Sequence, residues 1–198
     1  MENKLTQAVL PLSVAVAKTK GVSLPTAPVK MEEAAIRFLI DMVASEMTEY
    51  VLAKTPAERV DAILDALIYI TASAIRHGIY ALDVALSRDH GVQADVVSNS
   101  VLTYRGMLTL CSKSTVEEQI AHLNLMCARI AYFAEDELLP YLDEVSRANS
   151  SKITEQGTVV LNEQGKILKP AGFVPPNLEE IWSARHLLRK PIIGGLHV

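Results

Sequence analysis

Apolar residues recur at every third or fourth position through much of the chain, which is the spacing of one face of an α-helix. The two clearest patterns cover residues 30–53 and 56–77 and are separated by a turn at Lys54-Thr55-Pro56. Because this connection is short, we expect two antiparallel neighbouring helices. The core sides are predicted to consist of Ile36, Leu39, Ile40, Val43, Met47 and Tyr50 in the first and Val60, Ile63, Leu64, Leu67, Thr71 and Ala74 in the second.

Weaker helical patterns precede and follow this pair. The pattern over residues 5–17 contains Pro11, which predicts a helix that is kinked there or begins near it. Gly78 is expected to end the second helix of the pair. Two short helices are then predicted at residues 79–88 and 101–110.

A long apolar pattern follows from residue 116 to residue 145. Ser114-Thr115-Val116-Glu117 has the form of a capping box, so a helix is expected to begin there. Pro140 interrupts the pattern and is expected to kink or split the helix.

The character of the chain changes after residue 147. Residues 158–161 and 166–169 are predicted to pair as a short hairpin around Asn162-Glu163-Gln164-Gly165. Asn177 is expected to cap a last short helix containing Ile181, Trp182 and Leu188, and residues 191–198 to form a loose tail. The predicted fold is therefore all-α: an antiparallel helical bundle with added helices between the core helices and a short C-terminal hairpin and loop.

Composition narrows the class of protein. The 198 residues are 49% hydrophobic, which is enough for one well-buried domain. A formal charge of −4 argues against a general nucleic-acid-binding surface. There is no charged-then-apolar leader pattern and no apolar run long enough for a membrane span, so we expect a cytoplasmic protein. Cys111 and Cys127 stand in apolar surroundings and are expected to be reduced and buried.

Acidic residues gather on the central pair of helices. Glu46 and Glu49 share one helical face, and so do Glu58, Asp61 and Asp65. Folding the hairpin about its turn places Glu46 level with Asp65 and Glu49 level with Asp61. Carboxylates so close together must bind protons or a cation, and a hard divalent ion such as Mg²⁺ suits oxygen ligands. Two solvated acidic faces are the alternative.

Glu58 also fits a different role. Thr55-Pro56-Ala57-Glu58 is a capping box with proline at the first helical position. Capping is the more typical use of this residue, and metal ligation is a further candidate role.

A phosphate substrate would also need positive partners. Arg147, Asn149 and Lys152 lie at the end of the last long helix, and Lys166 and Lys169 follow. If this end packs beside the acidic helices, the side chains could hold phosphate oxygens. The alternative is a helix end with cations that match its dipole, followed by an ordinary solvated loop.

In residues 30–80 and 137–180 the chain resembles the MazG-like, all-α nucleoside triphosphate pyrophosphatases, relatives of phosphoribosyl-ATP pyrophosphohydrolase and dimeric dUTPase. The resemblance depends on four stretches: Glu46-Met47-Thr48-Glu49, then residues 58–65 with Tyr69 and His77-Gly78, then 144–152, and 165–176. It implies one helical domain over residues 1–198, with an insertion at 80–135 and a C-terminal loop and short helix at 149–190.

The resemblance also implies an activity. Family members hydrolyse a nucleoside triphosphate between the α and β phosphates, as house-cleaning or dUTP-type enzymes. By position, Glu46, Glu49, Asp61 and Asp65 would hold Mg²⁺, with Mn²⁺ as the alternative ion. Asn149 and Lys152 would contact the nucleotide, and Lys169 would bind phosphate. A homodimer or dimer of dimers is expected.

Two positions depart from the family pattern. Ser45 replaces an acid found before the first glutamate, and Ala62 stands where the second motif has a glutamate, so Asp61 must substitute. One position along a helix turns a side chain by about 100°. A catalytically idle nucleotide-binding or assembly protein on the same scaffold is therefore the alternative function.

Overall fold

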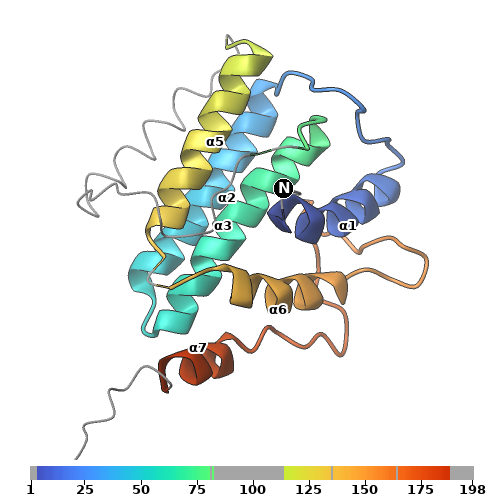
Figure 1. The fold of residues 1–198 in the computed structure, drawn as a ribbon. Coiled ribbons are helices and arrows are strands. Elements are labelled where there is room, and N and C mark those ends of the chain that lie inside the picture. Colours follow the sequence, from blue (N-terminus) through green and yellow to red (C-terminus); the bar gives the residue numbers. More distant parts are fainter. Residues whose placement is uncertain (1–3, 81, 83–113, 135, 164, 188–198) are drawn as a thin grey trace, which may run out of the picture.

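The computed structural model describes residues 4–80, 82, 114–134, 136–163 and 165–187. Within these residues all regular elements are helices, so the predicted all-α class is confirmed (Figure 1). The helices are α1 Lys4–Thr19, α2 Glu33–Leu52, α3 Pro56–Arg76, α5 Val116–Tyr132, α6 Leu139–Ser150 and α7 Leu178–Leu187.

The long helices α2, α3 and α5 lie side by side, and α1 and α6 cross them (Figure 1). Every residue predicted on the core side of α3 is buried. On α2 the prediction holds for Ile36, Leu39 and Val43. The other predicted residues, Ile40, Met47 and Tyr50, are partly buried against the same core. The central antiparallel pair is thus confirmed, and its helices end within three residues of the predicted bounds.

Both ends of α3 follow the expected local chemistry. The hydroxyl of Thr55 accepts the backbone N–H of Glu58 at 3.1 Å, and the Glu58 carboxylate accepts the N–H of Thr55 at 3.0 Å. At the other end Gly78 has φ 73, and the N–H of Ile79 donates to the carbonyl of Ala74 at 2.9 Å. These contacts satisfy backbone groups that a helix leaves unpaired at its termini.

Of the two alternatives predicted for α1, a kink at Pro11 or a start near it, the second is wrong. It starts at Lys4 and contains Pro11 within it. A proline removes one helical hydrogen bond. That loss is offset by burial of apolar side chains in the first turns, including Leu5 and Val9, which belong to the main core.

The long pattern after residue 116 is split, as predicted. The break falls between Tyr132 and Leu139, so Pro140 lies in the first turn of α6, where its missing N–H costs little. The N-cap of α5 was predicted one residue too early. Thr115 is the cap and Glu118 completes the box. Both Ser114 with Glu117 and Thr115 with Glu118 have the form of a capping box, so the motif alone does not decide which residue is the cap.

The predicted hairpin is present in minimal form. Leu161 and Ile167 form an antiparallel bridge, and the N–H of Leu168 donates to the carbonyl of Val160 at 2.8 Å. The hairpin is held against the end of α1, where the N–H of Val159 donates to the hydroxyl of Thr19 at 2.9 Å.

The C-terminal helix α7 lies beside the first turns of α3 (Figure 1). The Asn177 side chain accepts the N–H of Glu180 at 3.4 Å, as a cap should. Arg185 joins α7 to the segment before α6 through two hydrogen bonds to Asp136, at 2.7 and 3.1 Å.

None of the described helices is long and apolar enough to cross a membrane.

Part of the predicted insertion belongs to the core. Helix α5 falls within residues 80–135 and packs on α3, with Leu123, Met126 and Ile130 fully buried. Cys127 is a buried free thiol whose pKa burial raises to about 12, as expected of a reduced core cysteine. The short helices predicted at 79–88 and 101–110, Cys111, Leu188 and the tail lie outside the described residues.

Candidate functional site

The four predicted acids occupy neighbouring turns of α2 and α3. Glu46 and Glu49 lie in the last turns of α2, and Asp61 and Asp65 lie in the first half of α3. The Glu46 residue is only 9% exposed, Asp61 and Asp65 are half-buried, and Glu49 is exposed. We call these four side chains the acid cluster.

The electrostatic coupling inside the acid cluster agrees with the register predicted from the turn. Burial raises the pKa of Glu46 to about 8, and the strongest charge acting on it is that of Asp65. Burial also raises the pKa of Asp61, and there the strongest charge is that of Glu49. For Glu46 and Asp61 the strongest neighbouring charge is thus the one expected from counting along the hairpin, whereas Asp65 is acted on most strongly by Asp61 of its own helix.

Asp65 and Tyr69 extend the cluster along α3. The pKa of Asp65 is raised to about 7 by burial and then by Asp61. The pKa of Tyr69 is raised to about 12 by burial and then by the charges of Asp65, Glu46 and Glu49, so the phenol keeps its proton at neutral pH. Tyr69 was not among the predicted site residues, although its position one turn after Asp65 was a usable signal.

Positive side chains face the acid cluster from the last third of the chain. The charges of Lys152 and Lys169 offset part of the rise in the pKa of Asp61 and Asp65, and Lys166 does the same for Glu46. The Lys152 ammonium donates to the side-chain oxygen of Asn149 at 2.6 Å. Asn149, Lys152 and Lys169 are thus brought to the acids as the sequence predicted, and Lys166 joins them.

A phenylalanine between the lysines was missed by the sequence reasoning. The ammonium nitrogen of Lys152 lies 5.4 Å from the centre of the Phe173 ring, and that of Lys169 lies 5.1 Å from it. The available signal was that Phe173 is the single aromatic residue between positions 149 and 176.

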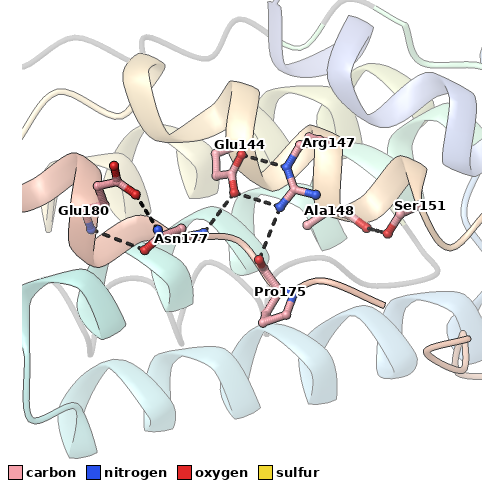
Figure 2. Close-up of polar contacts among 7 residues, drawn as sticks. All are labelled: Glu144, Arg147, Ala148, Ser151, Pro175, Asn177 and Glu180. Carbon is pink, nitrogen blue, oxygen red and sulfur yellow. Dashed lines mark hydrogen bonds and ion pairs between the residues drawn. The ribbon is translucent and has the colours of Figure 1, made fainter. Parts of the chain in front are cut away.

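Arg147 makes a different set of contacts. Its guanidinium donates to Glu144 at 2.8 and 2.7 Å and to the carbonyl of Pro175 at 3.2 Å (Figure 2). Glu144 also accepts the N–H of Asn177 at 2.9 Å, and the pKa of Glu144 is lowered to about 2, chiefly by Arg147. Arg147 therefore ties the loop after the hairpin to α6, and the structure does not join it to the acid cluster.

Glu58 is likewise committed to another task. Its carboxylate accepts the backbone N–H groups of Lys54 and Thr55, and these two bonds lower its pKa. Turning the side chain toward a metal would leave both groups unpaired. The capping role expected for Glu58 is confirmed.

The donor chemistry of the acid cluster fits Mg²⁺ or Mn²⁺. Carboxylate oxygens are the ligands these ions prefer, and Mg²⁺ usually keeps several waters and takes substrate phosphates as further ligands. Within the described residues no three acidic, imidazole or thiol side chains already lie close enough to hold a metal ion. The cluster thus offers suitable donors without a preformed three-ligand site.

The structure places the two residues that depart from the pattern of the resembled family, Ala62 and Ser45. Ala62 is 3% exposed and belongs to the core, so an acid at this position would be buried. Asp61, one position earlier, is the residue coupled to Lys152 and Lys169. Ser45 is exposed on α2 beside Glu46.

Comparison of the chain with protein-family models, with curated proteins and with solved structures found no match.

Proposed function

We propose that this protein is a Mg²⁺-dependent nucleoside triphosphate pyrophosphohydrolase, which converts a (d)NTP to the (d)NMP and pyrophosphate. The observation that carries the proposal is the placement of Lys152, Lys166 and Lys169 opposite the acid cluster. Clustered carboxylates facing lysines match a substrate that brings both phosphate oxygens and a metal ion.

Each residue has a chemical role in this proposal. Glu46, Glu49, Asp61 and Asp65 hold Mg²⁺ or Mn²⁺, which when bound screens phosphate charge and lowers the pKa of water. Lys152 and Lys169 bind phosphate oxygens, and the protonated hydroxyl of Tyr69 is a hydrogen-bond donor at the edge of the cluster.

The reaction requires water to attack one phosphorus atom of the α–β anhydride. The bond between that phosphorus and the bridging oxygen breaks, and the bridging oxygen leaves with the other product. A house-cleaning or dUTP-type role in the cytoplasm, by a homodimer or dimer of dimers, is part of the same proposal.

Pyrophosphate release tests the proposal directly. The full-length chain is incubated with Mg²⁺ and a panel of ribo- and deoxyribonucleoside triphosphates. We expect release with at least one of them, lowered by a factor of about 100 or more in Asp65→Asn, because this change removes a carboxylate from the metal-binding face. Asp41→Asn, at an exposed position of the neighbouring helix α2, is the matched control and should keep full activity.

A second function is favoured by one observation. Because no preformed three-ligand metal site is found in the described residues, the scaffold could bind nucleotide without hydrolysing it. In that case the same panel gives saturable binding, for example by calorimetry, and no pyrophosphate with either Mg²⁺ or Mn²⁺. Absence of both binding and turnover would refute both functions.

A further inference from the structure

The ring of Phe173 has two ammonium groups beside it. Lys152 and Lys169 lie 5.4 and 5.1 Å from its centre, within the distance of about 6 Å at which cation–π attraction acts. Two like charges beside one ring repel each other, and the pKa of Lys152 is lowered mainly by burial and further by the charge of Lys169. Something must therefore favour their proximity, and the ring and the acid cluster are the groups placed to do so.

The backbone that carries the ring is anchored on both sides of Phe173. The N–H of Phe173 donates to the carbonyl of Pro170 at 3.0 Å, which closes a turn. Gly172, the third residue of this turn, has φ 85, a value that favours glycine. Two residues further on, the carbonyl of Pro175 accepts from Arg147 on α6 (Figure 2). Phe173 therefore stands between two anchored points of the loop.

The lysines come from separate parts of the chain. Lys152 directly follows the C-terminal end of α6 and is held by the Asn149 side chain, whereas Lys169 is exposed and follows the hairpin. A free lysine side chain loses rotational freedom when it is fixed on a ligand, which weakens binding. A common ring lowers that loss for both side chains, because each ammonium group already has a preferred place.

We propose that Phe173 is a positioning residue that gathers the ammonium groups of Lys152 and Lys169 into one phosphate-binding subsite facing Asp61 and Asp65. That the ligand is a polyphosphate chain rests on the proposed function, whereas the grouping of the two lysines by the ring is independent of it. Two ammonium groups near one ring offer a polyphosphate chain two cationic partners in place of one.

The grouping can be measured without any ligand. In NMR spectra of the full-length protein, the ε-methylene protons of Lys152 and Lys169 should be shifted upfield by the ring current of Phe173. The shifts should disappear in Phe173→Leu and persist in Phe173→Tyr, which keeps an aromatic face. Ordinary lysine shifts in the wild-type protein would overturn the proposal, and this reading does not depend on whether Phe173→Leu folds.

Binding then tests the subsite. With inorganic tripolyphosphate and Mg²⁺, we expect Phe173→Leu to raise the dissociation constant about tenfold, since each cation–π contact contributes a factor of about two to five. Phe173→Tyr should stay within about twofold of the wild type. Equal affinities in the wild type and Phe173→Leu would overturn the proposal.

The outcomes separate this inference from the proposed function. If triphosphates are hydrolysed, Phe173→Leu should raise KM and leave kcat nearly unchanged, because the ring does not touch the reacting atoms. A normal ring-current signature without hydrolysis of any triphosphate would refute the proposed function alone. Hydrolysis with ordinary lysine shifts would refute the positioning role alone.

Discussion

Replacing Glu46 by glutamine should make the metal-free protein more stable at alkaline pH. The pKa of this buried carboxyl is raised from 4.5 to about 8 by burial and by the neighbouring acids. Between these values the folded protein keeps a proton that the unfolded chain has lost. The free energy of unfolding therefore falls as the pH rises through this window and levels off above it.

The size of the effect follows from the same shift. At full value a change of this size corresponds to about 5 kcal/mol, but solvent at the open side of the cluster and the coupled titration of Asp65 reduce it, so we expect about 2 kcal/mol. For a domain of this length that is about 4–8 °C in melting temperature. Glu46→Gln keeps the shape of the side chain and removes only the titrating group.

The assay is urea unfolding from pH 5 to pH 9 in the presence of a chelator. The stability of the wild type should decline across the window, and that of Glu46→Gln should decline less, so that the variant is the more stable protein at pH 8. Asp41→Asn, at an exposed position on the same helix, should follow the wild type. Parallel curves for the wild type and Glu46→Gln, or a variant that is less stable at pH 8, would refute the reasoning.

Two further changes test the scaffold that holds the site. Gly78→Ala should lower the free energy of unfolding by about 2 kcal/mol or more in urea, because φ is 73 and the new Cβ would lie 2.2 Å from the carbonyl oxygen of Ala27. Gly21→Ala, at φ 65 with open space around it, should cost about half as much, and equal losses would contradict the steric argument. Arg185→Met leaves the carboxylate of Asp136, a residue only 4% exposed, without its guanidinium partner, so hydrogen exchange of α7 should accelerate by about tenfold or more. Unchanged protection of α7 would show that the ion pair does not hold the helix.

The central pair of helices could be predicted because its determinants are local. The capping box at Thr55 fixes where α3 begins, and the three-residue turn leaves α2 one direction in which to pack. Once the register is set, counting residues gives the height of each acid. This is why the couplings of Glu46 with Asp65 and of Glu49 with Asp61 were predicted without coordinates.

The cationic side of the site depends on contacts between distant parts of the chain. Lys166 and Lys169 reach the acids because the hairpin packs on α1, through contacts such as that between Thr19 and Val159. Helical periodicity carries no information about such packing. Their charge and a family resemblance pointed to these lysines, whereas Phe173, although it lies in the resembling stretch 165–176, was not predicted as a site residue.

Arg147 shows the opposite problem. Its charge and its place near the end of α6 suggested a phosphate ligand, yet Glu144 stands three residues earlier on the same helical face and pairs with it at 2.7 Å. A spacing of three between opposite charges on a helix predicts this pairing, which takes Arg147 away from the phosphate site expected from its charge.

The acid cluster is best understood against other buried polar groups of the same protein. Asp136 accepts bonds from Arg185 and Tyr141, and Gln119 bonds to both the N–H and the carbonyl of Met31. Glu46 instead lies buried beside like charges, an arrangement that opposes folding. Local conflicts of this kind are expected at functional sites. A cation would remove the conflict, so Mg²⁺ should stabilise the wild type at pH 8 and stabilise Glu46→Gln much less. If Glu46→Gln is more stable than the wild type at pH 8 and Mg²⁺ still stabilises it as much as it stabilises the wild type, the metal binds elsewhere.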